Sequence, residues 1–237
     1  MTPEQFYEKL KEFGIELTEQ QQWQLHRYWE LLVEWNGFMN LTGITEINEV
    51  YLKHFYDSVI GFLMFEDIKN CKSMADVGSG AGFPALPVKI VFPHLEMALV
   101  DSLGKRVNFL NHVIKEVGLE NIEAYHARAE DFTKENRESF DIVTARAVAR
   151  LNMLAELCVP LVKEGGYFIA LKGQTGQEEL TESQKALDVL GVNIEVVYDV
   201  ELPNEAGSRT NIYTKKYKKT PNKYPRAFGQ IKNKPIK

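Results

Sequence analysis

The sequence predicts an α/β fold, a doubly wound and mostly parallel sheet of seven strands, preceded by a helical extension. An apolar run at residues 74–77 leads into a turn with glycine at positions 78, 80 and 82, and a helix-like segment follows. A second apolar run, at 95–101, ends in an acid, and strand-like and helix-like segments then alternate as far as residue 217. Such alternation predicts a parallel sheet with ligands bound at the carboxyl ends of its strands.

The first 70 residues are predicted to be helical. Thr2, followed by Pro3 and Gln5, has the pattern of a capping box with proline at the first helical position, and Gly14 is expected to end this helix. A second capping box at Thr18 begins a longer helix, whose apolar residues recur at three- and four-residue spacing. Both helices are therefore expected to bury one face.

Between residues 36 and 58 the polar residues no longer fit the pattern of an exposed helix face. His54 and Asp57 stand three positions apart, so on a helix they share a face. Two interpretations stay open. The pair orients a substrate or one end of a cofactor, or it is a capping or buried polar pair with a structural role.

The glycine turn indicates the class of ligand. Asp76 lies two residues before Gly78, so the spelling is Asp-x-Gly-x-Gly-x-Gly and differs from the G-x-G-x-x-G of dinucleotide sites. Glycine allows the sharp turn and a close approach of the backbone to a ligand. The pattern resembles motif I of the class I S-adenosylmethionine (SAM)-dependent methyltransferases, whose cofactor carries a sulfonium and an ammonium group. A purely structural turn is the alternative.

The segments after the turn complete the predicted sheet. Asp101 stands 21 positions after Gly80, at the tip of the neighbouring strand, where an acid reaches a ribose diol. After the third strand, a small residue followed by an acid, Ala129-Glu130, stands where class I enzymes frame the adenine ring. The expected strands and helices after residue 101 are strands 122–126, 140–144, 167–171, 192–200 and 208–217 and helices 104–117, 151–161 and 177–190.

Charge is distributed unevenly along the chain. The net charge is −5, but residues 206–237 contain ten Lys or Arg and no Asp or Glu, which leaves 18 basic and 33 acidic residues in the rest. A basic segment on an acidic body suggests contact with a polyanion such as nucleic acid, and a solubilising tail is the alternative. Three prolines and repeated lysines after residue 217 predict an extended arm that is mobile unless a partner orders it. We therefore divide the chain into a helical extension (1–70), an α/β domain (71–217) and a basic, proline-containing arm (218–237).

The composition also excludes several classes of protein. No apolar run approaches the roughly 18 residues needed to span a bilayer, and the first residues lack the features of a secretion signal. Cys71 and Cys158 are far apart and lack metal-ligand spacing. We expect them to be free thiols in the cytoplasm, and we expect no metal site.

The residues after the fourth strand limit the possible methyl acceptors. Enzymes that methylate exocyclic amines of bases carry Asn/Asp-Pro-Pro-Tyr/Phe there, and this chain has Thr144-Ala145-Arg146-Ala147 instead. Cys158 lies in an apolar helix pattern and is a poor candidate for the nucleophile of pyrimidine carbon methylation.

The absence of an amine-methylation motif and of a nucleophilic cysteine is consistent with guanine N7 as the acceptor. Its lone pair is already available, so no general base is required. The enzyme then has to align nitrogen, methyl group and sulfur. Arginine suits the task, since it binds guanine O6 or phosphate through two hydrogen bonds. The basic residues at predicted sheet-edge or helix-start positions, each with a surface ion pair as its alternative role, are Arg128, Arg146, Arg150 and Lys172.

Several motifs together resemble the RsmG/GidB family, the bacterial 16S ribosomal RNA guanine-N7 methyltransferases that act in the 530 loop. The resemblance covers nearly the whole chain, and it is the joint occurrence of the motifs in this order that is specific. The matching motifs are residues 40–42, 54–58, 76–84, 101–106, 129–130, 146–149, 171–173 and 224–226. The residues from Ala227 to Ile231 depart from the family, because they are less basic and less proline-rich than expected.

The resemblance implies SAM as cofactor, with S-adenosylhomocysteine as product. The implied cofactor-binding residues are Asp76, Gly78, Gly80, Phe83, Asp101, Ala129, Glu130 and Arg146. The implied catalytic residues, which position the reactants, are His54, Asp57, Arg146 and Lys172. With the charge pattern, the expected RNA contacts are Asn40, Arg128, Arg150, Lys172, Lys218, Lys219, Lys223 and Arg226.

The expected partner is 16S rRNA within the 30S subunit or its precursor. We expect no membrane or DNA partner, and a monomeric enzyme. Two alternatives stay open at this point: a SAM-dependent methyltransferase that acts on a substrate other than RNA, and a non-catalytic ribosome-assembly factor.

Overall fold

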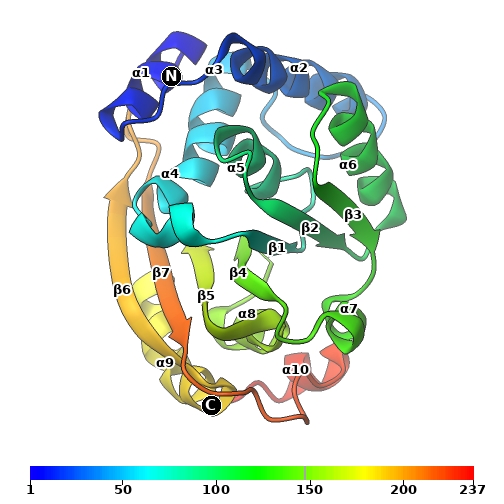
Figure 1. Cartoon of the computed structure of the whole chain (residues 1–237), viewed down its shortest axis with the longest axis vertical. Coiled ribbons are helices and arrows are strands. Elements are labelled where there is room, and N and C mark those ends of the chain that lie inside the picture. The colour runs from blue at the N-terminus through cyan, green and yellow to red at the C-terminus, as the bar shows by residue number, and fades with distance from the viewer. Residues whose placement is uncertain (147) are drawn as a thin grey trace.

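A seven-stranded sheet forms the centre of the computed structural model, which describes residues 1–146 and 148–237 (Figure 1). The strand order is β3-β2-β1-β4-β5-β7-β6. β1 to β5 pair in parallel, and β7 runs antiparallel to both β5 and β6. The predicted mostly parallel seven-stranded sheet is therefore confirmed. The strands are β1 (Ser73–Val77), β2 (Glu96–Asp101), β3 (Ile122–His126), β4 (Phe140–Arg146), β5 (Val162–Lys172), β6 (Val192–Glu201) and β7 (Ser208–Lys216).

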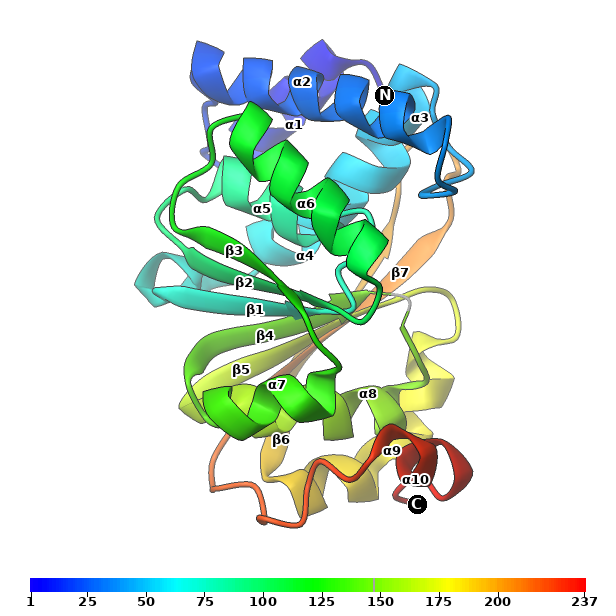
Figure 2. The same cartoon turned by 90° about the vertical axis from the view of Figure 1, so that its right-hand side faces the viewer.

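Helices cover both faces of the sheet (Figure 2). One face carries α1 (Pro3–Glu12), α2 (Glu19–Asn36), α3 (Ile47–Val50), α4 (Asp57–Leu63), α5 (Ala85–Val91) and α6 (Gly104–Glu116). The other carries α7 (Ala129–Asn136), α8 (Leu151–Cys158), α9 (Gly176–Leu190) and α10 (Phe228–Asn233). No helix among the described residues is long and apolar enough to cross a membrane.

The side chains of the central strands alternate between two hydrophobic cores. On β1, Met74 belongs to the core under α2 and α5, whereas Ala75 and Val77 belong to the core under α8. This period of two is the geometry of an extended chain, and because both faces are covered, these strands are apolar on both sides. The candidate active site lies at the carboxyl ends of two of these buried strands, β1 and β4.

The two predicted capping boxes are confirmed. The Thr2 hydroxyl accepts from the Gln5 N–H at 3.2 Å, and the Gln5 side chain accepts from the Thr2 N–H at 2.8 Å. Thr18 and Gln21 repeat this arrangement at the start of α2. Each cap satisfies backbone donors that a helix N-terminus leaves unpaired.

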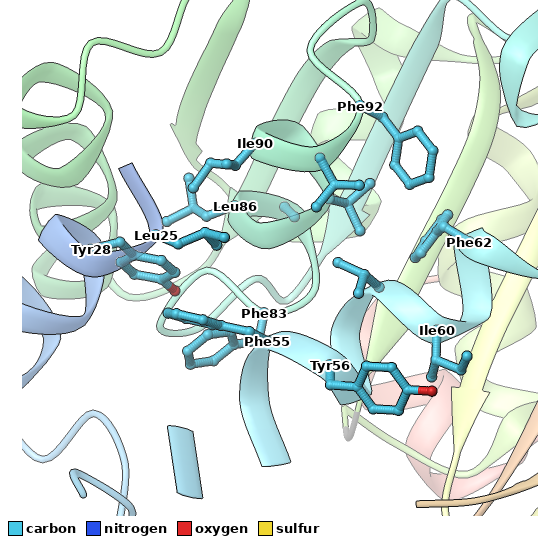
Figure 3. Close-up of a cluster of buried hydrophobic side chains, with 14 of the residues drawn as sticks. Leu25, Tyr28, Phe55, Tyr56, Ile60, Phe62, Phe83, Leu86, Ile90 and Phe92 are labelled. Carbon is cyan, nitrogen blue, oxygen red and sulfur yellow. The ribbon is translucent and has the colours of Figure 1, made fainter. Parts of the chain in front are cut away.

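Side chains of α2, α4 and α5 pack together in one cluster (Figure 3), and the same core includes Met74 and Leu99 of the sheet. Tyr28 of α2 lies against Phe55 and Phe83, with ring centroids 5.4 and 5.5 Å apart, and its hydroxyl donates to the Ala81 carbonyl at 2.5 Å. α2 is thereby attached to the glycine turn that follows β1. The boundary at residue 70 stays a prediction from sequence.

The prediction of an extended arm after residue 217 is wrong. Arg137 donates to the carbonyls of Thr220 and Tyr224, at 2.7 Å each, and Arg226 pairs with the buried Glu156 at 2.6 Å. The segment then forms α10, whose Ile231 is fully buried. Buried apolar side chains, together with Arg137 and the buried Glu156, therefore dock this basic segment against α7 and α8. Ala147, part of the predicted motif at 146–149, lies outside the described residues.

Candidate active site

The turn between β1 and α5 contains three glycines with positive φ. Gly78, Gly80 and Gly82 have φ of 78°, 59° and 97°, a region that glycine adopts readily. A Cβ on Gly78 would lie 2.6 Å from the Val148 side chain, and one on Gly82 would lie 2.4 Å from that of Leu86. The backbone therefore passes so close to neighbouring side chains at Gly78 and Gly82 that a larger residue would not fit there.

Asp101 attaches this turn to the end of β2. Its carboxylate accepts from the Gly80 N–H and from the Leu103 N–H, at 2.9 Å each, and the Arg106 guanidinium lies 3.6 Å away. A carboxylate has about four acceptor positions, so both oxygens retain capacity for hydroxyl donors. This geometry fits the predicted ribose contact.

Asp76 lies buried beneath the turn. The residue is 1% exposed, and neither of its carboxylate oxygens has a hydrogen-bond partner among the described residues. Burial raises the pKa of Asp76 to about 7, because the charged form is poorly solvated. A buried, unpartnered carboxylate next to the residues that line a cavity favours a positively charged ligand there.

Three adjoining cavities follow the carboxyl edge of the sheet. The first, of about 180 Å³, and the second, of about 420 Å³, share Gly78, Ser102 and Val148. The second and the third, of about 360 Å³, share His54 and Arg146. These three adjoining cavities, together called the cleft here, lie along the edge where the strand order reverses, which is where α/β sheets bind ligands.

Arg146, the last residue of β4, lies at the junction of the second and third cavities. Its guanidinium is 3.2 Å from Asp57 Oδ2 and 3.4 Å from Ser58 Oγ, and it lies over the Phe83 ring at 5.1 Å. The ion pair and the aromatic ring hold the planar group in one orientation. Arg146 is thus fixed between the two halves of the cleft.

His54 is neutral at physiological pH. Its ring stacks on Phe83 with centroids 4.5 Å apart, and its Nε2 lies 2.8 Å from the Thr42 hydroxyl. Burial, and next the positive charge of Arg146, lower the pKa of His54 to about 4. His54 and Asp57 both line the third cavity, but among the described residues no hydrogen bond joins them, because Asp57 is occupied by arginines.

Arg209 was not predicted from the sequence. This residue on β7 donates from Nε to Asp57 Oδ1 at 2.7 Å and lines the third cavity. Asp57 therefore lies between two arginines. The only signal in the sequence was that Arg209 belongs to the basic stretch that begins after residue 205.

Glu179 of α9 was also missed. It lies 2.8 Å from Lys172 Nζ at the end of β5, and it accepts from the Leu151 N–H at 2.8 Å. Lys172 in turn donates to the Ala149 carbonyl at 2.8 Å. Burial acts to raise the pKa of Glu179, but the Lys172 ammonium and the backbone donor outweigh it and hold the pKa below its usual value. The Lys172–Glu179 pair therefore holds Leu151 at the start of α8 and the Ala149 carbonyl in place.

Replacing Glu179 with glutamine is expected to lower the free energy of unfolding by about 2 kcal/mol, because the buried Lys172 ammonium loses its anionic partner. Urea unfolding would measure it. Glu178→Gln, at an exposed neighbouring position on the same helix, is the matched control. It should change the free energy of unfolding by under about 0.5 kcal/mol. Equal stabilities of the Glu179 and Glu178 variants would contradict the role given to this pair.

A model of the family described as GidB, rRNA small subunit methyltransferase G, matches residues 21–206. The chain belongs to the GidB family. It is 52% identical to the ribosomal RNA small subunit methyltransferase G of Lysinibacillus sphaericus (strain C3-41), over all of both chains. It is also 52% identical to the protein of that name from Staphylococcus aureus (strain Newman), over all of this chain and 99% of that one.

Solved structures of lower identity share the fold of this GidB-family chain. M. jannaschii TYW2, crystallised in complex with AdoMet, is 14% identical with a TM-score of 0.51, over 61% of this chain and 68% of that one. A mutant of MtNAS is 15% identical with a TM-score of 0.53, over 80% of this chain and 71% of that one. The class I methyltransferase fold predicted from the sequence is confirmed.

In this GidB-family chain the structure gathers most of the predicted site residues in the cleft. The first cavity contains Gly78, Arg128, Ala129 and Glu130, and the second contains Gly78, Gly80, Phe83, Asp101 and Arg146. The third contains His54, Asp57, Arg146 and Lys172. The predicted RNA-binding residues outside all three cavities are Asn40, Arg150, Lys218, Lys219, Lys223 and Arg226. All of these are exposed except Arg226, which is bound to Glu156.

Proposed function

We propose that this chain transfers the methyl group of SAM to N7 of a guanine in the 530 loop of 16S rRNA and releases S-adenosylhomocysteine. The family match and the 52% identity over whole chains support the reaction. The observation that carries the proposal is Arg146, which lies between a cavity lined by the glycine turn and a cavity lined by basic side chains. Donor and acceptor sites meet at this residue.

The residues of the first two cavities fit SAM. Asp101 is placed to accept from ribose hydroxyls, and the first cavity is lined by apolar side chains such as Val77 and Val100 beside the Glu130 carboxylate, which suits an adenine ring. The Asp76 carboxylate has no hydrogen-bond partner among the described residues. When ionised, it places negative potential beneath the turn, which suits a cation. When bound, SAM supplies a methyl group on a positively charged sulfur.

The third cavity suits a guanine that needs no deprotonation. Its two acids, Asp57 and Glu179, are bound to Arg146, Arg209 and Lys172, so neither is free to act as a base. A guanine N7 already has its lone pair, so these residues need only hold the base in line with the methyl group. The guanidinium groups of Arg146 and Arg209 are suited to bind guanine O6 or a phosphate.

The natural substrate in this proposal is the 16S rRNA of a 30S subunit or its precursor, bound by a monomeric, cytoplasmic enzyme with no DNA partner. A specific RNA loop has to be presented in a defined shape, and a folded particle does so better than free RNA. The exposed Lys218, Lys219 and Lys223 offer phosphate contacts away from the cleft.

The test is incubation with tritiated SAM and 30S subunits from a strain that lacks the enzyme. We expect about one methyl group per subunit, at guanine N7 in the 530 loop, as located by cleavage of the modified RNA. Subunits from the parent strain, already methylated, are the control and should take up no label. Absence of label on 16S rRNA, from a protein that binds SAM, would refute the proposed substrate.

A further inference from the structure

The segment at residues 217–233, here called the C-terminal strap, lies against the helices α7 and α8 (Figure 2). Three acidic or basic side chains of the body hold its first part. Arg137 donates to three of its carbonyls, and Glu138 accepts from the Thr220 N–H at 2.9 Å. Glu156, fully buried, accepts from the Arg226 backbone N–H at 2.9 Å and from its guanidinium at 2.8 and 2.6 Å.

The end of the strap reaches the cofactor half of the cleft. Phe228, the first residue of α10, is one of the residues that line the first cavity, together with Val77 and Ala129. Its backbone N–H donates to Glu130 Oε1 at 3.2 Å. Ile231, one turn further on, is fully buried in the core that also contains Val77.

We propose that Phe228 is a cofactor-contacting residue and that the C-terminal strap forms one wall of the adenine site. The inference rests on the proposed function, because it takes the first cavity to be the adenine end of a SAM site. An aromatic side chain at the wall of this cavity offers a flat apolar surface to a purine. The N–H of the same residue occupies one oxygen of Glu130 and leaves the other free for the ligand.

The strap also connects the cofactor site to the basic surface. Lys218, Lys219 and Lys223 are exposed on the same segment whose end closes the first cavity. A ligand that contacts Phe228 binds better when the strap is docked, so by linkage it stabilises the docked strap by the same amount. Cofactor binding therefore stabilises the docked conformation of the strap, which carries these lysines.

Isothermal titration of the full chain with S-adenosylhomocysteine tests the contact. Phe228→Ala is expected to raise Kd about tenfold, since stacking on a base is lost. Phe228→Tyr, which keeps the ring, should bind within about twofold of the unmodified chain, whereas Phe228→Leu, which keeps apolar bulk without a ring, should remain weak and a role in packing alone would be restored by it. Lys232→Ala, an exposed position on α10, is the matched control and should leave Kd unchanged.

Hydrogen exchange of the unmodified chain tests the strap without any variant. S-adenosylhomocysteine is expected to slow the exchange of amides in residues 224–233, including the Phe228 N–H that Glu130 accepts. Unchanged exchange in this segment, or an unchanged Kd for Phe228→Ala, from a chain that binds the ligand would overturn the inference and leave the proposed function standing. A chain that binds neither SAM nor S-adenosylhomocysteine would overturn the proposed function itself.

Discussion

Replacing Arg146 with alanine is expected to lower kcat/KM for methylation of 30S subunits by about 10²- to 10³-fold. Arg146 is bound to Asp57, lies over Phe83 and lines both the donor and the acceptor cavity, so its loss releases the base from its alignment with the methyl group. Steady-state kinetics with tritiated SAM would measure the change. The fold should persist, because Asp57 keeps its bond to Arg209.

Two companion variants separate geometry from charge. Arg146→Lys keeps the charge but not the planar group that makes paired hydrogen bonds, so it should recover only a small part of the activity. Lys134→Ala removes a positive charge from an exposed position on α7 and should leave kcat/KM unchanged.

The His54 resonances provide a second measurement. The positive charge of Arg146 helps to lower the pKa of His54 to about 4, so this pKa should rise in Arg146→Ala. An unchanged kcat/KM for Arg146→Ala would contradict the central role given to this residue.

The fold could be predicted from the sequence wherever the determinants are local. The capping boxes at Thr2 and Thr18 and the glycine turn after β1 each involve residues within a few positions of one another. The docking of the C-terminal strap could not be predicted in the same way. Its anchors Arg137 and Glu156 bond to residues 87 and 70 positions away, and composition alone made the segment resemble a free arm.

The same difference between local and long-range contacts decides which residues of the candidate site could be predicted. Gly78, Gly80 and Asp101 could be placed because an acid about 20 residues after a glycine turn falls on the neighbouring strand. Arg209 could not, because it meets Asp57 across 152 positions and only through the antiparallel strand β7. Glu179 could not be predicted either, because the sequence of an amphipathic helix does not indicate that one of its acids pairs with a lysine at the end of a strand.

Replacing Asp76 with asparagine is expected to have two opposite effects, weaker binding of SAM and a more stable protein without it. Loss of a buried negative charge near a cation, at an effective dielectric constant of about 20, corresponds to roughly 3 kcal/mol, so Kd for SAM should rise about 100-fold. The stability gain arises because Asp76 is 1% exposed and its carboxylate has no hydrogen-bond partner among the described residues. Titration calorimetry and urea unfolding would measure the two effects.

The stability difference should depend on pH with a defined sign. The pKa of Asp76 is about 7 in the folded chain and near 3.8 when unfolded, so between these values the folded state holds a proton that the unfolded state has lost. The contribution of this group to stability is then complete below pH 4 and is lost as the pH rises to 7. From pH 5 to pH 8, the free energy of unfolding of Asp76→Asn minus that of the unmodified chain should increase by about 2.5 kcal/mol.

Asp101→Asn is the matched control because both acids lie at the ends of neighbouring strands but only one has partners. Asp101 accepts from the N–H groups of Gly80 and Leu103, so its replacement should weaken SAM binding and also destabilise the free protein. Opposite changes in stability for these two variants, with the same loss of affinity, would separate a charge held ready for a cationic ligand from one that holds the turn together. If Asp76→Asn destabilised the chain at pH 8, or bound SAM as tightly as before, the negative potential beneath the turn would not be what attracts the cofactor.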